Sequence, residues 1–181
     1  MIFNPEICAQ PFSMALVRAT GQKRKYHPYL RRAVRAVVQE NGKYLLVYSA
    51  EEGDYKFPGG GVMAGESHAD ALRREVLEET GRTLKQLKTL LGTTIELDFP
   101  KGADTSVFRM ISFYYLCDLR DGESPLTLDP YENELGFTPV WVTPQQALRN
   151  NEELGFREGS DQLFWLARET AVLRALIRMC V

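Results

Sequence analysis

The chain has little cysteine, and its three copies, Cys8, Cys117 and Cys180, are far apart. An odd number of distant cysteines excludes a disulfide framework and a metal-knuckle spacing, and it suits a reducing cytoplasm. The N-terminus lacks a basic leader followed by a long apolar core, so we expect no signal peptide. The longest apolar run, residues 111–117, is far too short to span a bilayer. We therefore expect a cytoplasmic protein with no membrane partner.

An excess of charge of one sign is also missing, since 22 Lys and Arg stand against 24 Asp and Glu, a formal net charge of −2. This balance gives no reason to expect a nucleic-acid polymer as a partner. An anionic substrate would need positive charge supplied locally. Internal repeats, low-complexity tracts and linkers are absent from the 181 residues, so we predict a single mixed α/β domain over residues 1–181.

The first 29 residues are the least regular stretch, because three prolines and Gly21 interrupt them. They are interpreted as an N-terminal extension in which Met14–Val17 is expected to form one short strand. A basic run follows, made of Lys23, Arg24, Lys25, Arg31, Arg32 and Arg35. We interpret this run as a solvated loop and strand edge rather than as a phosphate-binding patch, since charge runs are usually solvated.

Apolar stretches separated by turn residues predict the strands. Residues 33–39 and 43–49 are rich in valine, leucine and tyrosine, and Asn41 and Gly42 between them suit a tight hairpin turn. Further strands are expected over residues 87–99, 107–119 and 137–142. Pro144 suits the first position of a brief helix. A longer helix is predicted over residues 160–179, with an apolar side facing the core or a partner: Leu163, Leu166, Leu173 and Ile177.

A helix is predicted over residues 68–80. Ser67 is a good N-cap and Asp70, three residues on, approximates a capping box. Gly81 can adopt the left-handed conformation that ends a helix. One stripe at helical spacing should face the core: Ala69, Leu72 and Val76.

This helix places Glu75, Glu78 and Glu79 within about 100° of arc, beside the buried stripe. A solvated acidic face is the ordinary alternative. Two effects count against it, because the helix dipole disfavours anions in the last turns and the three carboxylates repel one another at i,i+3 and i,i+4 spacing. Arg74 relieves only part of that repulsion. A divalent cation would remove the conflict, and magnesium takes oxygen ligands such as these.

Three glycines, Gly59, Gly60 and Gly61, precede the helix and let backbone groups approach a metal or an oxyanion without a Cβ in the way. Together with the clustered glutamates they form a specific pattern. The stretch resembles the Nudix box, G-x5-E-x7-R-E-U-x-E-E-x-G-U, where U is a bulky aliphatic residue. The matching positions are Gly60, Glu66, Arg74, Glu75, Val76, Glu78, Glu79 and Gly81. Arg82 departs from the pattern at its last position, where we expect only a shifted strand entry.

The resemblance implies a Nudix-like α/β/α sandwich with a mixed β-sheet, and it implies metal-dependent hydrolysis of a nucleoside diphosphate linked to another moiety. It assigns Mg²⁺, or Mn²⁺ in its place, to Glu75, Glu78 and Glu79, with the carbonyl of Gly59 as a further ligand. Gly60, Glu66, Arg74 and Gly81 would be structural, with an ion pair between Glu66 and Arg74 tying the loop to the helix. Glu78 and Glu79 would also take part in catalysis.

The base that accepts a proton from the attacking water is open among Glu134, Glu132 and a glutamate of the box; by resemblance Glu134, shortly before the strand at 137–142, comes first. Several aromatic residues are candidates for stacking on a base: Tyr48, Tyr55, Phe57, Phe99 and Phe108. The substrate stays open among ADP-ribose, other nucleotide sugars, dinucleoside polyphosphates and nucleoside triphosphates. A catalytically silent nucleotide-binding module is the alternative function. A homodimer through residues 1–29 or the last helix is also open.

Overall fold

The computed structural model describes residues 11–18, 27–98, 106–157 and 165–179. Seven strands form one sheet in the order β1-β5-β6-β2-β3-β4, with β7 paired to β3. The strands are β1 Phe12–Arg18, β2 His27–Glu40, β3 Lys43–Ser49, β4 Tyr55–Lys56, β5 Leu84–Asp98, β6 Ser106–Leu119 and β7 Phe137–Val142. The helices are α1 His68–Thr80, α2 Pro130–Glu134, α3 Pro144–Gly155 and α4 Leu166–Met179. None of these described helices has the length and apolar character needed to cross a bilayer.

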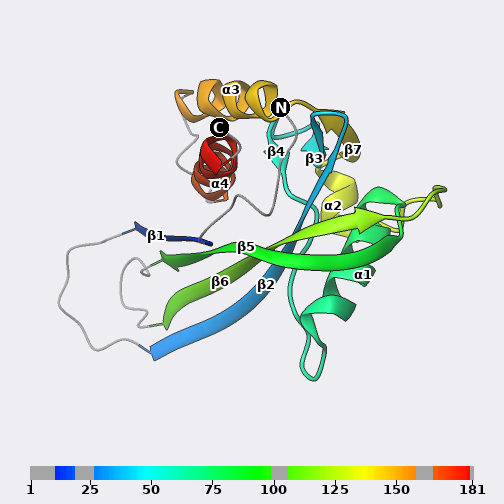
Figure 1. The fold of residues 1–181 in the computed structure, drawn as a ribbon. Helices are drawn as coiled ribbons and strands as arrows, with labels where there is room; N and C mark the ends of the chain where they lie inside the picture. The colour runs from blue at the N-terminus through cyan, green and yellow to red at the C-terminus, as the bar shows by residue number, and fades with distance from the viewer. Residues whose placement is uncertain (1–10, 19–26, 99–105, 158–164, 180–181) are drawn as a thin grey trace.

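The sheet is mixed, as predicted. β1 runs parallel to β5 and β2 runs parallel to β6, whereas the remaining neighbours are antiparallel. Helix α1 lies on one side of the sheet, and α3 and α4 lie on the other (Figure 1). This arrangement confirms the predicted α/β/α sandwich.

The hairpin turn is confirmed, since Asn41 and Gly42 have φ angles of 50° and 74°. The hairpin itself is short, because β2 pairs with β3 only at Gln39 and Glu40. The rest of β2 pairs in parallel with β6, from His27 opposite Ser106 onward. This exchange of partners leaves one edge of β2 free to receive the glycine loop.

Several predicted boundaries were wrong by a few residues. β1 is longer than 14–17, and β5 begins at Leu84 rather than at 87 because its first residues still pair with the end of β6. α3 is not brief: a capping box between Thr143 and Gln146 starts a helix of 12 residues. In the described part of the last helix, α4 begins at Leu166, and the predicted start at 160 lies outside the described residues.

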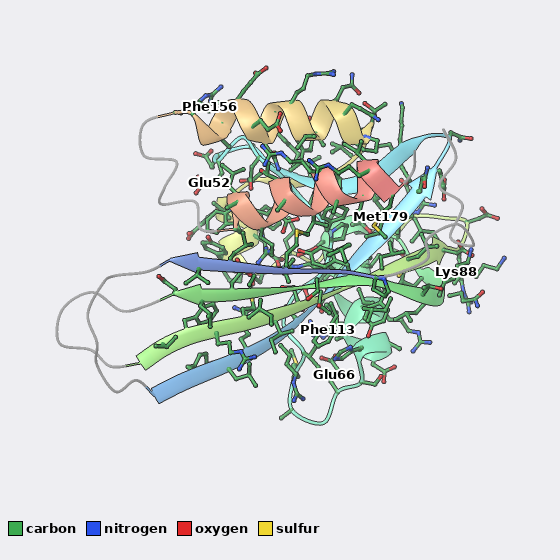
Figure 2. The ribbon with its side chains drawn as sticks, turned by 60° about the vertical axis from the view of Figure 1, so that its left-hand side comes forward. Glu52, Glu66, Lys88, Phe113, Phe156 and Met179 are labelled. Atoms are coloured by element: carbon green, nitrogen blue, oxygen red, sulfur yellow. The ribbon has the colours of Figure 1, made fainter. Side chains whose placement is uncertain are left out.

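Each face of the sheet has its own core. On the α3–α4 side the buried cluster is Val37, Tyr44, Leu46, Phe57, Leu91, Tyr114, Leu116, Ala147, Val172, Leu173 and Leu176. On the α1 side it is Val34, Ala36, Val38, Leu45, Ala71, Leu72, Val76, Leu84 and Cys117. Phe113 packs against the α1 cluster and Met179 against the other, and Figure 2 shows both side chains. Odd-numbered positions of β2 therefore face α4 and even-numbered ones face α1.

Helix α1 has the predicted bounds and both predicted caps. Ser67 accepts from the backbone N–H of Asp70, and Gly81 is left-handed at φ 66° with its N–H bonded to the carbonyl of Leu77. The predicted stripe needs one correction, because Ala71 is fully buried while Ala69 is half-buried. The face of α1 that packs on the sheet is centred nearer to Glu75 than the predicted stripe was. Two of the helix's glutamates are therefore buried.

Candidate active site

The glycine loop is held against the free edge of β2 by backbone hydrogen bonds. The N–H of Val34 donates to the carbonyl of Gly60 at 2.9 Å, and the N–H of Ala36 donates to that of Pro58 at 2.8 Å. Further on, the N–H of Val62 donates to the carbonyl of Arg32 at 2.9 Å. The loop is therefore as fixed as a strand, although it contributes only an isolated bridge to the sheet.

At two of the glycines an added Cβ would overlap neighbouring atoms, which are backbone at Gly59 and the end of a side chain at Gly60. A Cβ on Gly59 would lie 2.1 Å from the carbonyl oxygen of Val34, and Gly59 has a φ of 134°. A Cβ on Gly60 would lie 2.5 Å from the carboxylate of Glu75. The backbone at these two positions therefore reaches both β2 and α1 with no space for a side chain.

Arg74 ties the loop to α1 through the predicted ion pair with Glu66. Its Nε and Nη2 donate to the two carboxylate oxygens of Glu66 at 3.0 and 3.1 Å, and Nη2 also donates to the carbonyl of Gly61. This bidentate contact holds the pKa of Glu66 below its usual value. The remaining nitrogen of Arg74, Nη1, lies 2.7 Å from Glu75 and 3.3 Å from Glu78.

Three carboxylates gather where the loop meets α1. Glu75 and Glu79 are buried and Glu132 is half-buried, and each offers an oxygen within 4.8 Å of the other two. Burial raises the pKa of Glu79 to about 8, although Arg35 and the N–H of Gly59 favour its charged form. That N–H donates to Glu79 at 2.8 Å. Such a set of hard oxygen donors fits a divalent cation such as Mg²⁺.

The other predicted acids lie outside this trio. Glu78 has a side chain that is 37% exposed, and its contact is with Arg74. Glu134 is exposed at the end of α2 and does not line the pocket, whereas Glu132 does. Of the two candidate bases, Glu132 and not Glu134 meets the other acids of this trio, because a two-residue step along α2 turns the side chain by about 200°.

Glu132 is held in place by the cap of its own helix. The backbone N–H of Asp129 donates to its carboxylate at 2.9 Å, and Asp129 caps α2 in return. Burial raises the pKa of Glu132, an effect to which the nearby Glu75 and Glu78 add. The cap therefore aims this carboxylate at Glu75 and Glu79.

These carboxylates open into a pocket of about 590 Å³, a size that suits a nucleotide-sized ligand. Its cationic lining residues are Arg31, Arg35, Lys56 and Arg168, and its aromatic ones are Phe57, Phe108, Tyr131, Phe137 and Trp165. The pocket thus joins an acidic cluster, positive charge and aromatic surface.

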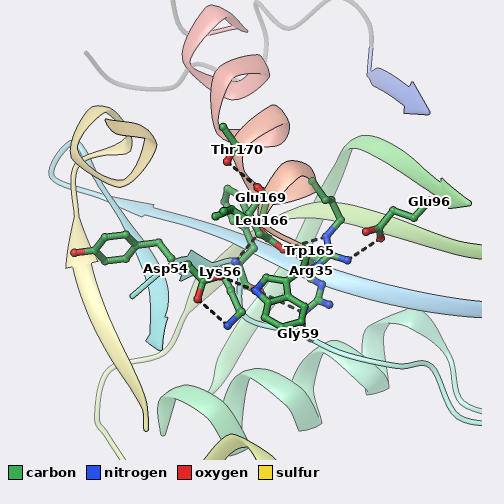
Figure 3. A network of polar contacts seen from close by, with 12 residues as sticks. Arg35, Asp54, Lys56, Gly59, Glu96, Trp165, Leu166, Glu169 and Thr170 are labelled. Carbon is green, nitrogen blue, oxygen red and sulfur yellow. Dashed lines mark hydrogen bonds and ion pairs between the residues drawn. The ribbon is translucent and has the colours of Figure 1, made fainter. Parts of the chain in front are cut away.

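Lys56 forms one wall of the pocket between two rings. Its Nζ lies 4.8 Å from the ring centroid of Phe137 and 4.9 Å from that of Trp165. The buried Asp54 accepts from Lys56 at 2.9 Å and from the indole N–H of Trp165 at 2.7 Å. Figure 3 shows Asp54, Lys56 and Trp165 of this wall beside Gly59. In this wall the charge of Lys56 is paired with that of Asp54, and the aromatic rings are held in place before any ligand binds.

A buried ion cluster joins α4 to β5, and its Arg168 lines the pocket. Arg168 lies 2.7 Å from both Glu96 and Glu169, and all three side chains are buried (Figure 3). Glu169 also accepts from the backbone N–H of Phe57 at 3.1 Å. The last helix thereby anchors the segment that leads into the glycine loop.

The cationic lining of the pocket was not predicted from the sequence. Arg31 and Arg35 were interpreted as part of a solvated run, but both line the pocket from one face of β2. Their spacing of four residues was the available signal, since it places them on the same face of a strand. The three lysines and arginines at 23–25 lie outside the described residues.

The predicted aromatic contacts were partly wrong. Phe57 and Phe108 line the pocket. Tyr48 and Tyr55 do not; their rings pack on each other with centroids 5.0 Å apart. Phe99 lies outside the described residues. Trp165 and Phe137, which the sequence did not single out, take the place of the tyrosines.

Known proteins resemble this chain in sequence and in fold. The family model of the NUDIX domain matches residues 29–163. The chain is 30% identical over 139 residues to an ADP-ribose pyrophosphatase of Methanocaldococcus jannaschii, covering 74% of this chain and 78% of that protein. It is 31% identical over 121 residues to the nucleoside triphosphatase NudI of Escherichia fergusonii, covering 64% and 83%. A MutT protein structure from Bacillus halodurans matches with a TM-score of 0.51 at 25% identity, covering 66% of this chain and 72% of that one.

The family match and these relatives therefore define a hydrolase of the pyrophosphohydrolase class. The chain belongs to the Nudix family.

Proposed function

We propose that this Nudix hydrolase depends on a divalent metal, Mg²⁺ or Mn²⁺, bound by Glu75 and Glu79 of the acidic cluster. The observation that carries the proposal is the convergence of Glu75, Glu79 and Glu132 within 4.8 Å at the floor of the pocket. Two of these carboxylates are buried side by side, an arrangement that a hard cation stabilises and that is costly without one. The carbonyl of Gly59, beside Glu79, and the carboxylate of Glu78 are the further ligands that we propose.

A bound divalent ion would polarise the diphosphate and lower the pKa of an attacking water. The proton of that water is taken up by a group of the protein. Glu132 is the base that we propose for this water, because it lines the pocket. Burial raises the pKa of its carboxyl group, which makes the carboxylate a stronger proton acceptor. Attack by the water oxygen on phosphorus breaks the bond to the bridging oxygen. The products are a nucleoside monophosphate and the second phosphorylated fragment or pyrophosphate.

We further propose that the nucleoside end of the substrate contacts the aromatic wall. Phe137 and Trp165 offer ring faces of the kind on which bases stack. The relatives include an ADP-ribose pyrophosphatase and a nucleoside triphosphatase, so the substrate class lies among nucleotide sugars and nucleoside triphosphates.

A panel of nucleoside diphosphate derivatives, assayed with Mg²⁺, with Mn²⁺ and with chelator, tests this function. Both substrate classes release a nucleoside monophosphate, but only a nucleoside triphosphate also releases pyrophosphate, so scoring pyrophosphate separates the two classes. We expect chelator to abolish turnover, and Glu79→Gln to lower kcat by a factor on the order of a hundred or more. Nucleotide binding without product in the presence of either metal would instead indicate the silent binding module.

The base is tested by a pair of variants on the same helix. Glu132→Gln should lower kcat by about a hundredfold with little change in KM, and Glu134→Gln should leave both unchanged. The reverse pattern would return the role to Glu134.

A further inference from the structure

Two of the four pocket cations, Arg31 and Arg35, make no ion pair among the described residues, and Arg35 is the half-buried one of the two. Lys56 lies 2.9 Å from Asp54, and Arg168 lies 2.7 Å from Glu96 and Glu169. Among the described residues Arg35 makes no ion pair; it donates to the backbone carbonyls of Phe57, at 3.5 Å, and Gly59. Its buried Nε has no hydrogen-bond partner in the described part of the chain. A donor is therefore left over for a ligand.

The carbonyl that Arg35 holds is the one that we propose as a metal ligand. Gly59 links the two through its peptide groups, since its N–H donates to Glu79 and its carbonyl accepts from Arg35. A guanidinium and a divalent cation at the same oxygen would repel each other strongly in a partly buried site. A metal that reaches this carbonyl therefore requires Arg35 to move aside.

On the proposed function above, we infer that Arg35 is a substrate-binding residue that exchanges partners: it holds the Gly59 carbonyl until metal and substrate bind, and then contacts a phosphate of the diphosphate. The metal would bring the diphosphate next to the displaced guanidinium. Arginine matches phosphate oxygens with several donors at once. Arg35 would then oppose metal binding alone and favour the binding of metal with diphosphate, so the two ligands bind cooperatively.

Titration calorimetry of the full chain tests this with Mn²⁺ and methylenediphosphonate, a non-hydrolysable diphosphate. In Arg35→Gln, we expect Mn²⁺ alone to bind severalfold more tightly than in the wild type. At saturating Mn²⁺, we expect methylenediphosphonate to bind about tenfold more weakly, because a charge-assisted hydrogen bond is lost. Arg35→Lys, which retains the charge but not the planar fork, should recover part of the diphosphonate affinity.

Arg32→Gln is the matched control. It removes the same charge from the same strand, but Arg32 lies on the α1 face and does not line the pocket. Both affinities should stay at the wild-type values, and melting temperatures report whether each variant is folded.

Unchanged diphosphonate affinity in Arg35→Gln would show that Arg35 does not contact phosphate. Unchanged or weaker Mn²⁺ binding would show that it does not compete for the Gly59 carbonyl. If the wild-type protein still hydrolyses its substrate, either result overturns this inference and leaves the proposed function standing. A wild-type protein that binds no Mn²⁺ would overturn both this inference and the metal dependence proposed above.

Discussion

Glu79 is a single carboxyl group on which folding and metal binding make opposite demands. Burial disfavours its charged form and raises its pKa to about 8 from a reference value of 4.5. A metal ligand must instead be deprotonated. As the metal ligand that we propose, Glu79 would lose this proton when a cation binds.

Without metal, this shift should make the protein less stable as the pH rises. Between pH 4.5 and pH 8 the folded state keeps a proton on Glu79 that the unfolded state has released, so the free energy of unfolding falls with rising pH in that window. Thermal melts in chelator should show a steeper fall for the wild type than for Glu79→Gln. Parallel pH curves for the two proteins would contradict the raised pKa.

Gly60 packs so closely against the acidic cluster that a single added atom would reach it. A Cβ in Gly60→Ala would press on the Glu75 carboxylate, the movable end of a side chain. We therefore expect the variant to fold and to bind Mn²⁺ at least about tenfold more weakly, since the displaced carboxylate is a proposed ligand. Calorimetry measures this affinity.

Gly61→Ala is the control for that change, because its Cβ would meet only the end of the Arg31 side chain, at 3.3 Å. Equal Mn²⁺ affinities in the two variants would show that Glu75 has room to move without loss.

Among the elements, α4 stands out because it supports the site without touching the acidic cluster. Its residues Arg168 and Glu169 form a buried ion cluster with Glu96 of β5, and Glu169 also holds the N–H of Phe57. Buried ion clusters contribute little net stability when complete, but losing one partner strands the others in a low dielectric. The helix thus locks the segment that enters the glycine loop.

Arg168→Met should therefore lower the free energy of unfolding by about 3–5 kcal/mol, because Glu96 and Glu169 lose their counter-ion. Arg174→Met on the same helix removes a half-exposed pair with Glu152 and should cost about 0–1 kcal/mol. Urea denaturation measures both. Similar losses in the two variants would mean that the cluster is not the specific anchor of α4.

The whole molecule is a sheet with one core on each face, and Cys117 reports on the α1 side of it. Its side chain is 2% exposed, and burial raises the pKa of its thiol to about 12. A buried neutral thiol reacts only when the structure opens. Labelling at Cys117 therefore measures opening of the fold.

Maleimide labelling followed by peptide mass mapping should leave Cys117 unmodified in the native protein and modify it in urea. Mn²⁺ with methylenediphosphonate should slow its labelling further at intermediate urea, since ligands that bind only the folded state stabilise it. Native labelling of Cys117 at the rate of the unfolded chain would contradict its burial.

The sequence alone was sufficient wherever the signal is local or periodic. Helix α1 with its two caps, the Asn41–Gly42 turn and the short strand β7 follow from neighbouring residues and fixed spacings. The ion pair of Arg74 with Glu66 was implied by the family resemblance. The family resemblance came from the same short stretch, because the glycine loop and helix α1 are continuous in the chain. Strand ends and the length of α3 were less well predicted, since pairing and capping decide them.

Only the tertiary structure decided which side chains meet. It brought Glu132 rather than Glu134 to Glu75 and Glu79, because the pitch and cap of α2 orient that residue. It also placed Arg35, taken from the sequence as solvated, against Gly59, because β2 leaves β3 and frees an edge for the loop. Contacts between segments so far apart in the chain leave no periodic trace in the sequence. The residues of the box could therefore be identified from the sequence, and the pocket around them could not.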